Sequence, residues 1–194
     1  MSFVKGFCTA ILTDSQFQGM DQVNDPSVLI FTHNRPLPIR LDWYVEHVLD
    51  QLSLPEEILV CSFNVVEKYL SQGLLCQFNI HNIVFTSISV CQKFVVTPWI
   101  NNASLEKVGG IKKGSLLSME SSLLNFINWK FNHNRFQETR IRLQALTNQE
   151  NSKEDSREDE NDDINGEFIC NDDCLFPVHS ELQGYFSVEL FESL

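Results

Sequence analysis

Two charged side chains stand inside apolar stretches of this sequence, and their types and positions make them its best candidates for a functional site. Lys93 lies near the end of an apolar stretch that covers residues 80–94. Glu120 has a leucine four residues before it and leucine or isoleucine three, four and seven residues after it. Because an unpaired buried carboxylate costs roughly 2–7 kcal/mol or more, Glu120 must reach solvent, an internal base or the donors of a partner. Lys93 has a simpler interpretation as well, as a cation that the negative end of a helix stabilises by roughly 0.3–1 kcal/mol.

A cysteine nucleophile is a second kind of chemistry that the sequence raises. Cys61 or Cys91 could act with His47 or His81 as the base. Cys91, however, lies in apolar sequence, and the sequence shows no base together with a residue that would orient it. The sequence therefore favours buried structural cysteines and predicts no enzyme activity and no small-molecule substrate.

A metal site is the third possibility. Cys170, Cys174 and His179 are close in sequence, but a zinc site needs about four ligands with matched spacing. We expect no metal and no cofactor. The other cysteines do not suggest a disulfide framework, and no secretory signal precedes them, so we expect a reducing compartment, the nucleus or the cytoplasm.

The negative charge of the chain is confined to its C-terminal part. Residues 1–147 contain 12 acidic and 12 basic residues, whereas residues 148–194 contain 14 acidic and 2 basic ones. A neutral body has no dominant basic field, which argues against a nucleic-acid partner. No apolar run is long enough to cross a bilayer, so we expect no membrane partner.

The elements that must position Lys93 and Glu120 are helices, because apolar residues recur at helical spacing and alternation typical of strands is scarce. The stretch 80–94 is apolar nearly all round, which is typical of the buried central helix of a bundle. The fold class predicted is therefore all-α. The expected helices cover residues 39–52, 56–70, 80–94, 103–108, 116–129 and 136–146.

Three local patterns predict where helices begin. Ser53 and Glu56 have the spacing of a capping box, in which each side chain accepts from the other residue's backbone amide. Asn101 or Asn102 can cap the short helix 103–108. Ser115 is placed to cap the helix that carries Glu120.

The segments outside residues 37–131 are less regular. Residues 1–36 form an N-terminal extension, with a short helix possible over 1–12 and either a strand or a helical turn over 27–31, and we expect it to pack on the outside of the main domain. Residues 132–147 form a flanking helix; the R-x-x-L sequence at 140–143 resembles a degradation signal, but Leu143 belongs to the apolar stripe of that helix. Residues 148–166 are predicted to be an acidic, disordered linker. Residues 167–194 form an apolar tail that either docks on the body or folds on a partner.

An ordered series of short motifs adds a resemblance to a known family. It comprises Phe78-Asn-Ile-His81, Phe85-Thr-Ser-Ile-Ser-Val-Cys-Gln-Lys-Phe94, Asn101-Asn102, Glu106-Lys-Val-Gly-Gly-Ile111, Ser118-Met-Glu120 and Phe126-Ile-Asn-Trp-Lys-Phe131. This series resembles the cyclin box, and most closely that of the P/U-type cyclins, the phosphate-regulating cyclins of yeasts and their plant and protozoan relatives. The resemblance covers about residues 37–131, which implies a single cyclin box, a five-helix bundle around a buried central helix with flanking helices.

The resemblance also implies a function. Lys93 matches the lysine of the family's S-K-F motif, and Glu120 matches the glutamate of its L-E motif. In cyclins these two residues face a cyclin-dependent kinase and hydrogen-bond the backbone at its C helix, so each is expected to gain its partner only in the complex. Lys93, Phe94, Glu120 and Leu123 are accordingly the expected kinase-binding residues. The implied role is that of a non-catalytic regulatory subunit, in cell-cycle control or phosphate signalling.

One alternative keeps the fold but changes the partner. The acidic residues that usually follow S-K-F in the family are replaced here by Val95-Val96-Thr97-Pro98. This replacement favours a helical interaction module that binds a protein other than a kinase.

Overall fold

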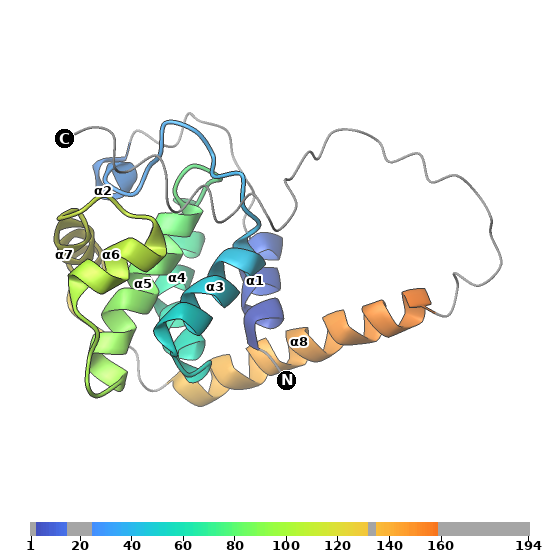
Figure 1. The fold of residues 1–194 in the computed structure, drawn as a ribbon. Coiled ribbons are helices and arrows are strands. Elements are labelled where there is room, and N and C mark those ends of the chain that lie inside the picture. Colours follow the sequence, from blue (N-terminus) through green and yellow to red (C-terminus); the bar gives the residue numbers. More distant parts are fainter. Residues whose placement is uncertain (1–2, 15–24, 132–134, 159–194) are drawn as a thin grey trace. The chain divides into compact units, whose positions relative to one another are not determined.

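The computed structural model describes residues 3–14, 25–131 and 135–158, and within these ranges every regular element is a helix (Figure 1). The chain divides into two compact units, Met1–Ser152 and Lys153–Leu194. The all-α prediction is confirmed for the described residues. The helices are α1 (Phe3–Asp14), α2 (Pro26–Leu29), α3 (Leu41–Leu52), α4 (Glu57–Ser71), α5 (Ile80–Val95), α6 (Asn102–Gly109), α7 (Leu116–Phe126) and α8 (Phe136–Glu158).

Helix α5 is the centre of the first unit, as its apolar sequence predicts. Every residue from 80 to 92 is buried, and α5 packs against α3, α4 and α7 (Figure 1). The fit around it is close: a Cβ added to Gly109 of α6 would lie 2.4 Å from the ring of Phe85. Only glycine therefore lets the end of α6 approach the central helix at this point.

The first N-terminal helix belongs to the core, which corrects the expectation that residues 1–36 pack on the outside. Val4, Phe7, Ala10 and Ile11 of α1 are buried, and the helix packs against α3 and α4. The rings of Phe7 and Phe63 meet edge to face, with their centroids 6.0 Å apart. The apolar residues of α1 recur at helical spacing, so this face needs a partner surface just as the box helices do.

The predicted capping box at residues 53–56 does not form. Ser53 instead ends α3 in the left-handed conformation (φ 49°), and its amide donates to the carbonyls of Leu49 and Asp50. The carboxylate of Glu56 accepts the backbone amide of Phe3 at 2.7 Å. Glu56 thus joins α1 to the start of α4 instead of capping its own helix.

The two caps beside the central helix have different outcomes. Asn101 caps α6 as predicted, because its side chain accepts the amide of Ser104 at 2.9 Å. Ser115 makes no side-chain cap on α7. The buried carboxylate of Glu106, on α6, accepts the amide of Leu116 at 3.0 Å instead. The start of α7 is therefore fixed by its neighbouring helix.

Several helix ends differ from the sequence expectation. Helix α7 ends at Phe126, three residues early, where Asn128 and Trp129 adopt positive φ angles of 54° and 56°. Helix α8 runs on to Glu158, so the first part of the predicted acidic linker is helical, and residues 159–194 lie outside the described part of the chain.

The structure also decides two alternatives that the sequence left open. The region 27–31 contains a helical turn, α2, capped by Asp25, and not a strand. Leu143 is fully buried, which supports the structural interpretation of the sequence at 140–143.

The motif at the start of α5 ties down the segment that leads into α3. The side-chain amide of Asn82 donates to the carbonyl of Phe31 at 2.8 Å. The Nε2 atom of His81 lies 2.9 Å from the carbonyl oxygen of Ile39 and must carry the proton, because a carbonyl only accepts. The backbone amide of His33 donates to the carbonyl of Phe78 at 2.9 Å. These bonds hold the irregular segment 31–39 against the central helix.

Candidate functional site

The two charged residues singled out from the sequence meet in one ion pair. The ammonium nitrogen of Lys93, in the last turn of α5, lies 2.6 Å from each carboxylate oxygen of Glu120 on α7. Their exposure is uneven: 25% of the Lys93 side chain is accessible to solvent, against 7% of the Glu120 side chain. The pair therefore lies at the rim of the core, with the carboxylate on the inner side.

Two neutral side chains complete this cluster. Asn102, the first residue of α6, accepts from Lys93 at 2.6 Å through Oδ1 and donates to Glu120 at 3.3 Å through Nδ2. Ser89, one turn before Lys93 on α5, donates to the other carboxylate oxygen of Glu120 at 2.5 Å. The cluster Ser89–Lys93–Asn102–Glu120 thus draws on three helices and satisfies the buried carboxylate within the chain, as a buried charge requires.

This geometry corrects one expectation and decides between others. The expectation that Lys93 and Glu120 gain partners only in a complex is wrong, because each is the other's partner in the free chain. Of the three ways in which Glu120 could be satisfied, the structure shows the internal base. Local sequence marked both residues as unusual, but their pairing depends on how α5 and α7 pack.

The turn between α5 and α6 is held in place by the central helix. Gln92 accepts the amide of Ile100 at 3.1 Å and donates to its carbonyl at 3.3 Å. This two-bond bridge brings the start of α6, and with it Asn102, back beside Lys93. The sequence identified Asn102 as a possible helix cap and as part of the Asn101-Asn102 motif, but no local signal showed that it joins the ion pair.

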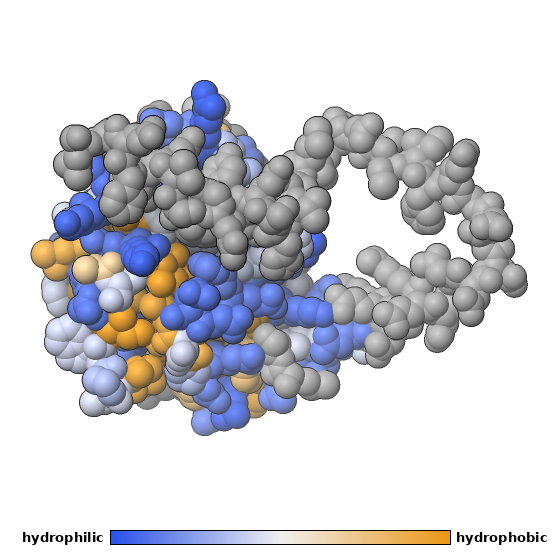
Figure 2. Space-filling view, viewed as in Figure 1, coloured by the Kyte–Doolittle hydropathy of each residue, from blue (hydrophilic) through white to orange (hydrophobic). Residues whose placement is uncertain are grey.

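Large apolar side chains are exposed close in sequence to the cluster. Phe94 and Val95 directly follow Lys93, and Leu117 precedes Glu120 by one helical turn. Their exposed fractions are 64% for Phe94, 51% for Val95 and 66% for Leu117, and Trp99 and Trp129 are similarly exposed. Figure 2 shows hydrophobic residues gathered over α5 and α6 on one face, beside hydrophilic residues over α3. Exposed apolar groups around a charged pair are typical of a protein-binding surface.

The four residues expected to bind a partner do not all lie at the surface. Phe94 is exposed and its ring packs against that of Phe131, with the centroids 4.8 Å apart. Leu123 has no exposed surface. In this conformation Leu123 supports α7 from the core, while Lys93, Phe94 and Asn102 remain accessible.

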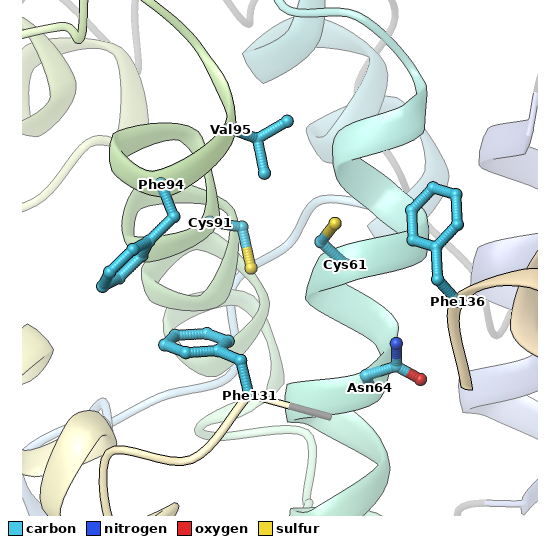
Figure 3. A pocket seen from close by; sticks show the side chains of 7 residues that line it. All are labelled: Cys61, Asn64, Cys91, Phe94, Val95, Phe131 and Phe136. Carbon is cyan, nitrogen blue, oxygen red and sulfur yellow. The ribbon is translucent and has the colours of Figure 1, made fainter. Parts of the chain in front are cut away.

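A small apolar pocket of about 50 Å³ opens beside Phe94 (Figure 3). Figure 3 shows the thiols of Cys61 and Cys91 between α4 and α5 at this pocket. The remaining lining residues are Asn64, Val95, Phe131 and Phe136.

The thiols at this pocket are poor nucleophiles. Burial raises the pKa of Cys91 to about 12 and also raises the pKa of Cys61. Neither of the two bases considered for them, His47 and His81, lines the pocket. His81 is bonded to Ile39, and its ring meets that of Tyr44 edge to face at 5.2 Å. Burial lowers the pKa of His81 to about 4. The geometry gives no support to a cysteine–histidine catalytic pair at these positions.

The described ranges contain neither a cluster of metal ligands nor a membrane-spanning helix. No group of three or more histidine, cysteine, aspartate or glutamate side chains is arranged to hold a metal ion there. The sequence candidate formed by Cys170, Cys174 and His179 lies outside those ranges. None of the helices described is both long and apolar enough to span a membrane.

Comparison with known proteins agrees with this architecture. Residues 13–132 match the family model for the cyclin N-terminal domain. The chain is 28% identical over 107 residues to Cyclin-P3-1 of Oryza sativa subsp. japonica, which covers 54% of this chain and 44% of that protein. It is 24% identical over 106 residues to Cyclin-U3-1 of Arabidopsis thaliana, covering 54% of this chain and 48% of that protein.

The match includes all the helices of the predicted box and both charged residues of the cluster. It begins before residue 37, where the sequence motifs placed the start of the box. The chain spans about half the length of the curated relatives that it matches. The two curated relatives, a P-type and a U-type cyclin, are consistent with the P/U-type resemblance of the motifs. Because the family model covers more than half of the chain and the described fold is all-helical around a buried central helix, this protein belongs to the cyclin family.

Proposed function

We propose that this chain is a regulatory subunit that binds and activates a cyclin-dependent protein kinase. The observation that carries the proposal is the position of Lys93 and Glu120. The cyclin resemblance implies that both residues contact the kinase, and in the folded chain they lie together at the rim of the core. Exposed apolar side chains lie close to them in sequence, which supports a contact with another protein at this place.

The proposed mechanism needs no catalytic group from this chain. A kinase is active only when its C helix lies inward, so that its own lysine–glutamate pair can form. A cyclin that binds the inward state better than the outward one shifts the population toward it. Phe94 and Leu117 would supply apolar contact area for this binding, while Lys93 and Glu120 would fix its orientation through hydrogen bonds.

The compartment and the biological output belong to the same proposal. A kinase regulator of this type would act in the nucleus or the cytoplasm, in cell-cycle control or in a response to phosphate. Imaging of a fluorescent fusion tests the compartment. Comparison of kinase activity in phosphate-rich and phosphate-starved cells distinguishes the two outputs.

A second candidate function rests on the segment after Phe94. Val95 is 51% exposed where the family usually has acidic residues, so this part of the surface is apolar instead of charged. Such a surface also suits a protein other than a kinase. Under this alternative the cyclin fold serves as a helical interaction module.

Affinity purification of the full chain tests the proposal against this alternative. The bait is the wild-type chain, and a matched bait carries Lys93→Ala and Glu120→Ala. We expect mass spectrometry to identify a cyclin-dependent kinase with the wild-type bait and much less of it with the double variant. If the wild-type bait recovers other proteins reproducibly but no kinase, the interaction-module alternative replaces the proposal.

A further inference from the structure

The side chain of Asn102 offers the ion pair the same two groups as a peptide bond. Its carbonyl oxygen accepts from Lys93 at 2.6 Å, and its N–H donates to Glu120 at 3.3 Å. A backbone peptide bond likewise has one carbonyl oxygen that accepts a hydrogen bond and one N–H that donates one. The Lys93–Glu120 pair therefore already holds a peptide-like group in the free chain.

The hydrogen-bonding capacity of the pair is fully used in this state. The ammonium of Lys93 has three N–H donors, and three contacts are made, to the two oxygens of Glu120 and to Asn102. One carboxylate oxygen of Glu120 accepts hydrogen bonds from Lys93 and Ser89, and the other accepts hydrogen bonds from Lys93 and Asn102. A partner can form good hydrogen bonds with this pair only if it displaces a group that is already there.

Of the two neutral members, only Asn102 can be displaced from the solvent side. Ser89 is fully buried on α5 beneath the carboxylate. Asn102 is half-buried, at the first position of α6, and its side chain donates to the carboxylate oxygen of Glu120 that Ser89 does not contact. Rotation of the Asn102 side chain would free one donor on Lys93 and one acceptor site on Glu120 while leaving α6 and its Asn101 cap in place.

We propose that Asn102 is an internal competitor for the docking site, occupying at Lys93 and Glu120 the place that a partner's backbone peptide group takes on binding. The inference rests on the proposed function for the identity of the partner. It adds a residue that sets the affinity of the site. The class of ligand, a main-chain carbonyl and N–H, is the one that the cyclin resemblance implies for Lys93 and Glu120.

The direction of the affinity change in two variants tests this role. The probe is the kinase recovered by the wild-type chain, with its dissociation constant measured by calorimetry. Asn102→Ala removes the competitor, and we expect the kinase to bind about three- to tenfold more tightly, in line with one hydrogen bond to a charged group. Asn102→Asp places a carboxylate beside Lys93 and has no N–H for Glu120, so we expect weaker binding than wild type.

Two matched variants control for changes that do not involve the competitor. Ser104→Ala truncates a neighbouring exposed residue of α6, and Asn101→Asp adds the same charge one residue earlier while keeping a capping side chain. Both controls should change the dissociation constant less than the Asn102 variants do. Weaker or unchanged binding by Asn102→Ala would overturn the inference, because it would make Asn102 a supporting residue or a bystander. Absence of binding by the wild-type chain would instead count against the proposed function.

Acetamide, a small molecule with one peptide-like amide, tests the ligand class without any kinase. In Asn102→Ala the vacated place should accept acetamide, so the melting temperature of this variant should rise with acetamide relative to wild type and to Ser104→Ala. Binding that raises stability in this way follows mass action. Equal responses of the three proteins would contradict a peptide-group site at Lys93 and Glu120.

Discussion

The Lys93–Glu120 pair is exposed unevenly, so its two members should respond differently to removal. Lys93→Ala leaves a carboxylate with only 7% of its side chain exposed and with Ser89 and Asn102 as its remaining donors. We expect this variant to lose about 2–4 kcal/mol of unfolding free energy, since a buried charge without its partner is strongly destabilising. The double variant Lys93→Ala/Glu120→Ala removes the stranded charge and should be at least as stable as the single one. Urea unfolding followed by circular dichroism measures both; a loss in the double variant equal to the sum of the two single losses would contradict this coupling.

His81 should make folding stability depend on pH. Burial lowers its pKa from 6.5 to about 4, with a smaller effect from the nearby His33. Between pH 6.5 and pH 4 the unfolded chain therefore binds a proton that the folded chain does not, so stability falls as the pH falls through this window. The largest loss from this residue is about 3 kcal/mol, reached near pH 4.

The matched variant His81→Gln keeps a side-chain N–H for the carbonyl of Ile39 but cannot titrate. Its unfolding free energy should fall less than that of the wild type between pH 6.5 and pH 4. Parallel curves for the two proteins would show that His81 is not responsible for the pH dependence.

Helix α7, which carries Glu120, begins at an amide held by the neighbouring helix. Glu106→Ala leaves the amide of Leu116 without its acceptor, and the site is buried. We expect this change to cost about 1–3 kcal/mol of unfolding free energy. Ser115→Ala, at the residue that sequence alone selects as the cap, should change stability by no more than about 0.5 kcal/mol. Chemical denaturation of both variants checks the ranking, and a larger loss for Ser115→Ala would contradict the structural assignment.

The difference between Ser115 and Glu106 shows which features of the elements can be predicted from sequence. Apolar spacing located the central helix because burial on all sides leaves a mark at every position of α5. Capping by Asn101 was predictable, since acceptor and amide are three residues apart. The acceptor for Leu116 lies ten residues away on another helix, so no local pattern reveals it.

In the candidate site, too, local features could be predicted from the sequence and contacts between helices could not. Its two charged members could be found because charges interrupt apolar stretches. The contact of Asn102 with the ion pair could not be predicted, because it depends on the turn that Gln92 holds against α5. Which side chains pair between different helices depends on how the helices pack, and a single sequence reveals little of this packing.

On the scale of the whole molecule, the compact unit Met1–Ser152 indicates where the chain can be truncated without loss of stability. Thr147 of α8 accepts the backbone amide of Gly6 at 3.2 Å, and a Cβ on Gly6 would lie 2.4 Å from the Thr147 hydroxyl oxygen. Residues 1–152 should therefore fold with a melting temperature close to that of the full chain. Residues 1–146 lack the contact between α1 and Thr147 and should melt at a lower temperature.

Calorimetry of the two truncated chains measures this difference. Equal melting temperatures for residues 1–146 and 1–152 would show that the end of α8 adds nothing to the body. A large loss for residues 1–152 relative to the full chain would show that the remaining C-terminal residues contribute to the stability of the body.

Kinase docking at Lys93 and Glu120 is tested by the activity of the recovered kinase with two double variants of this chain. Lys93→Ala/Glu120→Ala and Arg135→Ala/Glu138→Ala each remove one acidic and one basic side chain and leave the net charge unchanged, but only the first two residues lie in the proposed docking site. The second variant removes both ion pairs of Arg135, with Glu138 and with Glu67. We expect the first variant to lose kinase activation and to retain its helicity, with its affinity for the kinase reduced roughly thirtyfold or more. The second variant should activate the kinase like wild type. Full activation by Lys93→Ala/Glu120→Ala would contradict the proposal that the kinase docks at these two residues.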